Sequence, residues 1–327
     1  METDVIRIDP ASPDPGAIVR AADVLARGGL VALPTETVYG LGARADDAAA
    51  VARIFAAKGR PAYNPLIVHV AGEDAARGLA SRWPALASKL AAAFWPGPLT
   101  LVVPRDRARV PDAVCAGGDT VAVRCPAHPV ALALLKEVPF GVAAPSANRF
   151  QSLSPTTAAH VLKGLAGRVD LVLDAGPCDR GIESTVVDVS GEVPVLLRPG
   201  ALARTALEAV AGPLADPSPP AEEGAARRSP GMDRKHYAPR ARMVMARGDA
   251  VEEALRSAGT RVGLVTWRAR ERRDVERLPD DPAGYGARLY AALHALDDAG
   301  CDAIVVEELP DSPGWEAVRD RLARACG

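Results

Sequence analysis

Paired cysteines, long apolar runs and a strong charge of one sign are all missing from this sequence. Its five cysteines include no CxxC pair, which argues against a dithiol centre or a zinc ribbon. No apolar run approaches the roughly 20 residues that a membrane-spanning helix needs. The chain also opens without a basic segment followed by an apolar one. We therefore expect a cytoplasmic protein with no membrane partner.

A basic surface and stacking aromatics are equally scarce. The net charge at pH 7 is −2, and aromatic residues make up 4% of the chain. Proteins that bind nucleic acid need cations for the phosphates and often aromatic rings for the bases, so any polyanion site must be local. Only five of the 39 Lys and Arg residues are Lys. An Arg at one position therefore says little about function, whereas a Lys is more informative.

Strands and helices alternate through the first two thirds of the 327-residue chain. Apolar periodicity predicts helices over residues 18–27, 48–57, 83–94, 129–135 and 156–165. Short apolar runs predict strands over residues 30–33, 66–70, 99–103, 120–124, 141–144, 171–174, 184–188 and 195–198. This mixture predicts an α/β architecture with a twisted sheet covered by helices.

The composition changes between Gly212 and Arg240, where Pro, Gly, Ser and charged residues dominate. Such a stretch cannot bury a core, so we predict a linker over residues 213–240 between domains at 1–212 and 241–327. In the second domain, the predicted strands 242–246, 262–267 and 303–306 alternate with predicted helices 251–258, 282–298 and 315–325. Three β-α units predict a small parallel sheet, although neither GxGxxG nor a Walker loop is present.

Several cations and amides crowd the stretch "KGRPAYNPLIVHV". Lys58 and Arg60 flank a glycine where a helix ends, and prolines on both sides fix Asn64. His69 lies in the strand that follows. Cations commonly complement a helix C-terminus, and a lone His is usually a core or surface residue, so a purely structural role also fits Lys58 and His69.

The stretch "DTVAVRCP" places Thr120 and Arg124 four residues apart, and therefore on one face of a strand. A guanidinium buried on so apolar a strand costs several kcal/mol without an anionic partner. Arg124 therefore needs a carboxylate, either from the protein or from a ligand.

Further polar groups lie at strand ends, where open α/β sheets usually bind ligands. They are Thr35, Glu36 and Thr37 in "PTET", Ser146 and Asn148 in "APSAN", Ser184 in "IEST", and Arg198 in "LLRPG". A capped turn explains "PTET" equally well. No Ser-His-Asp order and no metal-ligand spacing accompanies them. Cations, hydroxyls and amides suit a reaction run by positioning and charge stabilisation, above all one that involves phosphates.

These motifs together resemble a known family. "PTETVYGLG", "KGRP" followed by "NPLIVH", "FWPGPLTLV", "VAVRCP", "APSAN" and "ESTVVD" occur in the order found in the YrdC/Sua5 family of threonylcarbamoyl-AMP synthases. The resemblance covers about residues 18–202, and "SPGMDRKHYAPRA" with the trailing domain is similar to the longer, Sua5-type members. It implies a YrdC-like twisted mixed sheet with helices, plus a smaller C-terminal Rossmann-like parallel-sheet domain.

The resemblance also implies a reaction. L-threonine, bicarbonate or CO2, and ATP with Mg²⁺ would give L-threonylcarbamoyladenylate and pyrophosphate, which is a nucleotidyl transfer. Separate proteins would then use the product to make N6-threonylcarbamoyladenosine (t6A) at position 37 of tRNAs. tRNA and the proteins of that pathway are therefore implied as further partners.

Residue by residue, the resemblance assigns two ligands. It assigns L-threonine to Thr37, His69, Arg124, the Ala144 backbone and Ser184. It assigns ATP to Lys58, Arg60, Asn64, Thr120, Ser146, Asn148, Ser154, Arg198 and Tyr237. Lys58 and Arg60 would be catalytic, because they would neutralise charge on phosphate or carbamate. The linker, which carries His236 and Tyr237, would fold over the pocket as a lid.

Two other functions remain open from the sequence. A related fold could bind double-stranded RNA or tRNA, and a local basic run is formed by Arg227, Arg228, Arg234, Lys235, Arg240 and Arg242. A paralogue could instead hydrolyse carbamoyl or acyl adenylates. Synthase chemistry requires that the polar strand ends meet at one cavity large enough for a nucleotide beside an amino acid.

Overall fold

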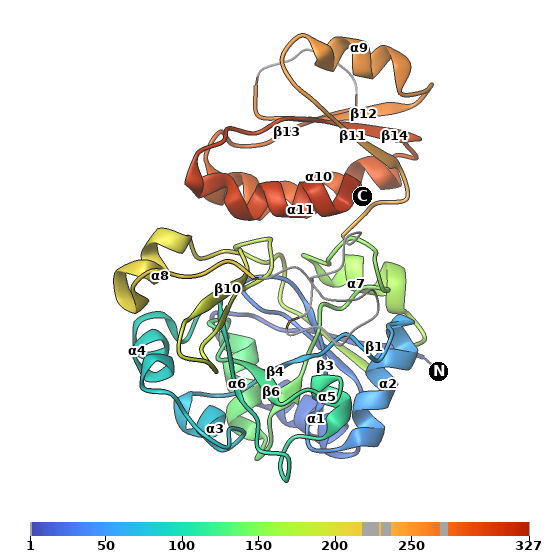
Figure 1. The fold of residues 1–327 in the computed structure, drawn as a ribbon. Coiled ribbons are helices and arrows are strands. Elements are labelled where there is room, and N and C mark those ends of the chain that lie inside the picture. The colour runs from blue at the N-terminus through green and yellow to red at the C-terminus, as the bar shows by residue number, and fades with distance from the viewer. Residues whose placement is uncertain (1, 218–228, 230–236, 269–273, 327) are drawn as a thin grey trace.

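The N-terminal unit of the chain, up to residue 211, is built on a ten-stranded mixed sheet (Figure 1). The computed structural model describes residues 2–217, 229, 237–268 and 274–326. The strand order is β1-β8-β2-β3-β7-β4-β6-β5-β9-β10. The strands are β1 (Asp4–Arg7), β2 (Val31–Leu33), β3 (Gly40–Arg44), β4 (Ile67–His69), β5 (Leu99–Pro104), β6 (Thr120–Arg124), β7 (Val142–Ala143), β8 (Leu171–Asp174), β9 (Thr185–Asp188) and β10 (Val195–Arg198).

Helices cover both faces of this sheet, and each face has its own apolar core. The helices are α1 (Pro15–Ala26), α2 (Ala48–Lys58), α3 (Glu73–Arg77), α4 (Ala85–Phe94), α5 (Asp112–Cys115), α6 (Pro129–Glu137), α7 (Ala158–Leu165) and α8 (Arg204–Ala211). One core joins α1 and α6 to the sheet, and the other joins it to α2, α4, α5, α7 and α8. The sequence-based prediction of a twisted mixed sheet with helices is confirmed.

Three strands of the structure were not predicted, and β3 shows why. Its sequence is GLGAR, which lacks the β-branched residues that mark most strands. A Cβ at Gly42 would lie 2.9 Å from both Leu33 and Val142 on neighbouring strands, so the crowded sheet requires glycine there. The strands β1 and β13 were missed as well, because each is short and half exposed.

The C-terminal unit contains a four-stranded sheet in which every strand is parallel. Its strands are β11 (Arg242–Ala246), β12 (Val262–Thr266), β13 (Val275–Arg277) and β14 (Ala303–Glu307), in the order β11-β14-β12-β13. Its helices are α9 (Ala250–Ser257), α10 (Pro282–Asp298), the short turn η1 (Pro313–Trp315) and α11 (Glu316–Cys326). The predicted small parallel sheet is confirmed, with β13 as an additional strand.

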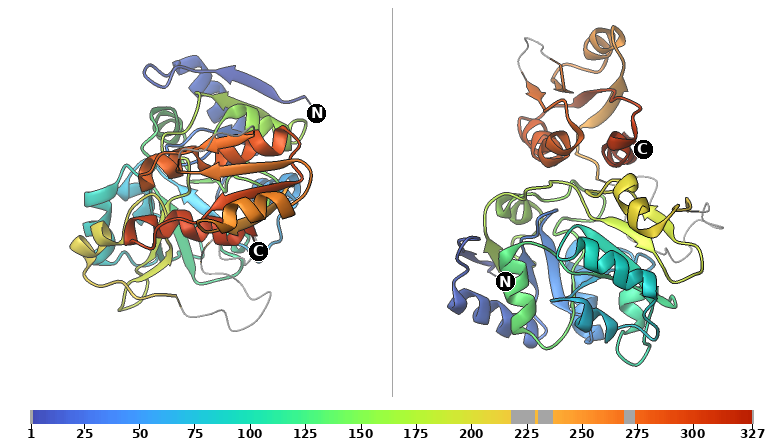
Figure 2. Two further views of the ribbon diagram at one scale, coloured as in Figure 1. Left: turned by 90° about the horizontal axis from the view of Figure 1, so that it is seen from above. Right: turned by 90° about the vertical axis from the view of Figure 1, so that its left-hand side faces the viewer.

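Helices α10 and α11 lie between the small sheet and the N-terminal unit, and α9 lies on the far face (Figures 1 and 2). One apolar core contains Val38 and Ile182 of the N-terminal unit together with Tyr285, Leu289 and Val318 of the C-terminal unit. The two units are therefore packed against each other through a shared core. In the part of the chain that the structure describes, no helix has the length and apolar character to span a bilayer.

Candidate functional site

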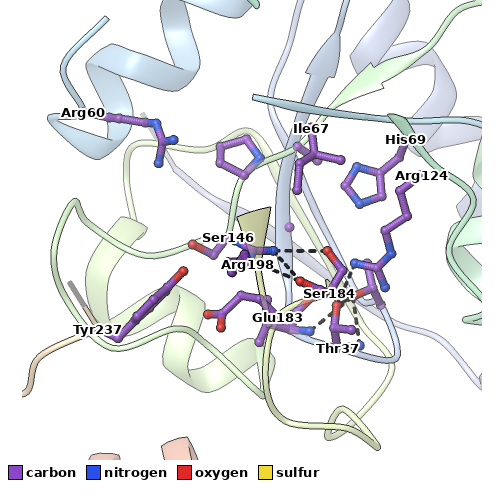
Figure 3. Close-up of a pocket in the computed structure, with 15 residues that line it drawn as sticks. Thr37, Arg60, Ile67, His69, Arg124, Ser146, Glu183, Ser184, Arg198 and Tyr237 are labelled. Carbon is purple, nitrogen blue, oxygen red and sulfur yellow. Dashed lines mark hydrogen bonds between the residues drawn. The ribbon is translucent and has the colours of Figure 1, made fainter. Parts of the chain in front are cut away.

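Strand ends and loops of the N-terminal unit meet around one cavity (Figure 3). Its wall is formed by Thr35, Thr37, Val38, Gly40, Arg60, Ile67, His69, Arg124, Ala144, Pro145, Ser146, Glu183, Ser184, Arg198 and Tyr237. Nine of the fourteen residues that the resemblance assigns to the two ligands are among them. In Figure 3, Arg60, Ser146 and Tyr237 lie on one side of the cavity, and Thr37, His69 and Arg124 lie on the other.

His69 and Arg124 lie next to each other because β4 and β6 run parallel and pair these two residues in register. Ala144 reaches the same place from β7, and its N–H donates to the carbonyl of Ile67 (2.9 Å). Parallel strands end at one edge of a sheet, which explains how residues 55 positions apart converge.

Arg124 is 3% exposed, and each of its three guanidinium nitrogens lies close to a polar group. Nη1 donates to the Thr37 hydroxyl (2.9 Å), and Nε donates to the Gly97 carbonyl (3.2 Å). Nη2 lies 2.7 Å from Oε1 of Glu36. The positive charge of Arg124 thus lies at the cavity wall, next to the Thr37 hydroxyl.

The charge partner of Arg124 is a carboxylate of the protein. The sequence left open whether the protein or a ligand would compensate the burial of Arg124, and the structure supplies Glu36. Glu36 is 6% exposed and also accepts from the backbone N–H of Ala127 (3.1 Å). The sequence placed this carboxylate at a strand end in "PTET", but sequence spacing alone could not reveal that it reaches Arg124, 88 positions away.

His69 is a neutral imidazole at physiological pH. Burial, with the neighbouring Arg124 charge, lowers the pKa of His69 from 6.5 to about 3. A neutral ring at this position can accept or donate a hydrogen bond without repelling a substrate ammonium.

This shift gives a testable dependence of stability on pH. Between about pH 6.5 and pH 3, the unfolded chain binds a proton at His69 that the folded protein does not bind. The free energy of unfolding should therefore fall on acidification, by up to about 1.4 kcal/mol per pH unit for this group. Thermal melting at pH 7 and pH 5 should show a smaller pH-dependent shift for His69→Gln than for the unsubstituted protein. Equal shifts in the two proteins would contradict this assignment.

Ser184 and Arg198 form a connected part of the wall at the start of β9 and the end of β10. Arg198 Nε and Nη2 donate to the Ser184 carbonyl (3.1 and 2.9 Å), and Nη2 also donates to the Ser184 hydroxyl (3.1 Å). The Ser184 hydroxyl also shares a 2.7 Å hydrogen bond with the hydroxyl of Thr100. Burial lowers the pKa of the Arg198 guanidinium, which nevertheless remains charged at neutral pH.

Lys58 lies behind the cavity wall. Its Nζ donates to the carbonyl oxygens of Ser146 and Asn148 (2.5 Å each) and to Oδ1 of Asn148 (3.2 Å). Oδ1 of Asn148 also accepts from the Ser146 hydroxyl (2.6 Å). Burial, with the nearby Arg60, lowers the pKa of Lys58 well below its usual value. In this conformation Lys58 holds the loop that presents Ser146 to the cavity.

The turn after α2 explains how Arg60 reaches the cavity while Lys58 does not. Gly59 adopts the left-handed conformation (φ 64°) that ends many helices, and Lys58 is the last helical residue. Arg60 then donates from Nε to the Asn64 carbonyl (3.3 Å) and from Nη2 to the Pro65 carbonyl (2.9 Å). Asn64 itself is fully buried and supports the Arg60 side chain through its backbone.

Five of the residues that the resemblance assigns to the two ligands are absent from the cavity wall: Lys58, Asn64, Thr120, Asn148 and Ser154. Thr120 lies at the opposite end of β6 from Arg124, roughly 13 Å away for four strand residues. The Ser154 hydroxyl is buried and donates to Glu183 (2.5 Å). These positions reach a ligand in the cavity only through other residues or after a rearrangement.

Glu183 is a cavity residue that the sequence analysis missed. It lines the wall immediately before Ser184, and its carboxylate accepts from Ser154, from the Tyr290 hydroxyl (3.2 Å) and from Arg321 Nε (2.6 Å). Burial alone would raise its pKa, but the charges of Arg321 and Arg198 outweigh burial and lower it. Glu183 is the first residue of the motif "ESTVVD", but the motif does not show its role, because Arg321 lies 138 positions away.

Tyr237 brings the end of the linker to the cavity. It is 2% exposed, adopts a left-handed backbone (φ 63°), and its ring lies against Tyr290. His236 and most of the linker lie outside the described residues, so the proposed lid remains a prediction. Of the basic run, Arg240 pairs with Asp297 and Arg242 donates to the Ala258 carbonyl. The other four members of the run also lie outside the described residues.

Comparison with known proteins identifies the family. A family model for Sua5, YciO and YrdC, described as "Telomere recombination", matches residues 23–200. A second model, described as "Threonylcarbamoyl-AMP synthase, C-terminal domain", matches residues 202–327.

Individual relatives match over nearly the whole chain. A threonylcarbamoyl-AMP synthase of Pyrococcus abyssi is 41% identical, over 94% of this chain and 93% of that protein. A protein of the same name from Bacillus subtilis is 39% identical, over 98% and 95%. The crystal structure of P. abyssi Sua5 complexed with L-threonine superimposes with a TM-score of 0.93, covering 99% of this chain and 98% of that one at 39% identity. The chain therefore belongs to the Sua5/YciO/YrdC family and carries the C-terminal domain of the threonylcarbamoyl-AMP synthases.

Proposed function

We propose that this protein is an L-threonylcarbamoyladenylate synthase, which joins L-threonine, bicarbonate or CO2, and ATP and releases pyrophosphate. The observation that carries this proposal is the convergence of Arg60, Arg124 and Arg198 with hydroxyl groups around one cavity (Figure 3). Relatives that match nearly the whole chain bear this enzyme name, and one of them has been crystallised with L-threonine.

The part of the cavity around Arg124 suits L-threonine. A planar guanidinium that lines the cavity can bind the α-carboxylate. The neutral His69 ring and the hydroxyls of Thr37 and Ser184 offer hydrogen bonds for the amino and hydroxyl groups. The amine must lose a proton to solvent before its nitrogen can form a bond to CO2, and the neutral His69 ring can accept a hydrogen bond from that amine. Glu36 keeps the buried Arg124 charge compensated before the substrate binds.

The part of the cavity around Arg60, Ser146 and Arg198 suits the phosphates of ATP. A carbamate oxygen of threonylcarbamate attacks the α-phosphorus, a P–O bond forms, and the bond to the β-phosphate oxygen breaks to release pyrophosphate. Negative charge spreads over the phosphate oxygens in this transition state, and fixed cations stabilise it. Lys58 acts indirectly, because it holds the loop that carries Ser146.

Mg²⁺ enters this proposal as a partner of ATP. Within the described ranges, no group of three or more His, Cys, Asp or Glu side chains is placed to hold a metal ion. The carboxylates at or beside the wall, Glu36 and Glu183, are already paired with arginines. Mg²⁺ commonly keeps several waters and binds to substrate phosphates, so ATP oxygens would supply its main ligands.

The product carries a mixed anhydride of a carbamate and AMP, so it can transfer the threonylcarbamoyl group to an acceptor amine. We propose that this acceptor is the adenosine at position 37 of tRNA, reached through the separate proteins that make t6A. Direct binding of tRNA to this chain is not needed for the synthase step.

The decisive test is to incubate the protein with ATP, bicarbonate and L-threonine and to measure pyrophosphate and the adenylate by mass spectrometry. We expect both products, and neither when threonine is omitted. Release of AMP from an adenylate added to the protein, with no pyrophosphate formed from ATP, would indicate an adenylate hydrolase instead. Salt-sensitive RNA binding without any turnover of ATP would favour the nucleic-acid-binding alternative.

A further inference from the structure

Arg321, on α11 of the C-terminal unit, contacts both chain segments that carry Ser184 and Arg198 to the cavity. We propose that Arg321 is a positioning residue for this site, so that the C-terminal unit completes a cavity formed by the N-terminal unit. The role in turnover rests on the proposed function, whereas the role in holding the two segments does not.

The Arg321 side chain is fully buried, and each of its three nitrogens has a partner. Nε donates to Glu183 Oε2 (2.6 Å), and Nη2 donates to the Pro199 carbonyl (3.1 Å). Nη1 donates to Asp320 Oδ2 (2.5 Å), which fixes the guanidinium from its own helix. One rigid, planar group therefore joins the segment before β9 to the segment after β10.

The segment before β9 transmits this contact directly to Ser184. Glu183 precedes Ser184, and its carboxylate is held by Arg321, Ser154 and Tyr290. Its carbonyl accepts from the N–H of Ala201 (3.2 Å). The backbones pack so closely that a Cβ at Gly200 would lie 2.5 Å from the Glu183 carbonyl oxygen. A shift of Glu183 would therefore move Ser184 as well.

The segment after β10 closes a ring of contacts. Pro199, which binds Arg321, follows Arg198, and Arg198 in turn donates to the Ser184 carbonyl. The Arg321 guanidinium also lies over the ring of Tyr237, 5.2 Å from its centroid. Arg321 thus contacts Glu183 and Tyr237 of the cavity wall, and through Glu183 and Pro199 it holds the chain neighbours of Ser184 and Arg198, without lining the cavity itself.

A buried ion pair often contributes only to the packing of the fold. The test must therefore separate an effect of Arg321 on the position of the cavity segments from an effect on the stability of the protein. Arg321→Lys keeps the charge beside Glu183, but an ammonium cannot bind Glu183 and Pro199 in the same planar geometry. The matched control is Arg324→Lys, because Arg324 lies on the same helix and binds the same Asp320. The double variant Glu183→Gln/Arg321→Met removes both charges together and guards against loss of folding from an unpaired carboxylate.

We would measure thermal melting, amide hydrogen exchange across residues 183–201, the threonine Kd by calorimetry, and kcat. Well below the melting temperature, Arg321→Lys and the double variant should exchange faster over 183–201. They should also bind threonine at least about tenfold more weakly and turn over at least about tenfold more slowly. Arg324→Lys should match the unsubstituted protein in all four measurements.

The proposal is overturned if Arg321→Lys has the same amide exchange, threonine Kd and kcat as the unsubstituted protein. A lower melting temperature or faster exchange with unchanged Kd and kcat would overturn it as well, because Arg321 would then be a packing residue. If the unsubstituted protein forms no pyrophosphate, the proposed function fails. The exchange comparison then still decides whether Arg321 holds the two segments.

Discussion

Replacing Arg124 with alanine should raise the KM for threonine about 100-fold or more and change the KM for ATP only a few-fold. Two charge-assisted hydrogen bonds to a carboxylate contribute about 1.5 to 3 kcal/mol each, so the loss of both accounts for an effect of this size. Steady-state kinetics with each substrate varied in turn would measure both values. Arg124→Lys should recover part of the loss, because it keeps the charge but not the planar fork.

Glu36 makes controls necessary for this experiment. Without Arg124, the Glu36 carboxylate would be buried beside the cavity without its cation, and that alone could distort the wall. The double variant Glu36→Gln/Arg124→Gln avoids this, and it should bind threonine as weakly as Arg124→Ala. Glu36→Gln alone removes a competitor for the guanidinium, so we expect it to bind threonine at least as tightly as before. Equal losses of threonine and ATP in Arg124→Ala would show that Arg124 is structural.

The fold was largely predictable because its strands are apolar and its helices periodic. The predicted bounds of β6, β8 and β10 agree with the structure, and those of α10 agree as well. Strand β3 was missed because packing in the middle of the sheet selects glycine at Gly42, which removes the usual strand signal. Local sequence patterns therefore fail where tertiary crowding determines the residue.

The sequence predicted many of the residues that line the cavity, but not the contacts between them. The motif order identified the polar strand ends, and nine of the residues it singled out line one cavity. The sequence could not show that Lys58 turns away to bind the 146–148 loop, or that Ser154 binds Glu183. It also left Glu36 and Glu183 unassigned, because each carboxylate is defined by an arginine far away in the sequence.

These two carboxylates change how the charge of the cavity is understood. The sequence suggested that the site has more cations than anions, and that these cations bind phosphates and a substrate carboxylate. The structure instead pairs Arg124 with Glu36 and Arg321 with Glu183, and both pairs are buried. Arg60 and Arg198 line the same cavity as Ser146, and we expect these two cations to meet an incoming triphosphate.

Replacing Arg60 with alanine should consequently lower kcat by about 100- to 1000-fold, the usual effect of losing one fixed group that stabilises transition-state charge. The threonine Kd should stay within a few-fold of its normal value, because Arg60 lies across the cavity from His69 and Arg124 (Figure 3). Single-turnover formation of the adenylate at saturating ATP would measure the effect, and threonine calorimetry would supply the second value.

Arg60 also holds the carbonyls of Asn64 and Pro65, so a fall in kcat could follow from movement of that loop. Arg60→Lys separates the two causes: an ammonium retains the charge near the phosphates but loses the planar contact to both carbonyls. If charge is what matters, Arg60→Lys should keep much more activity than Arg60→Ala. Arg77→Ala, at an exposed pair with Glu73, should leave kcat unchanged. Equal losses of kcat in the lysine and alanine variants would instead show that Arg60 holds the loop, and Arg198 would then be the cation that stabilises the transition-state charge.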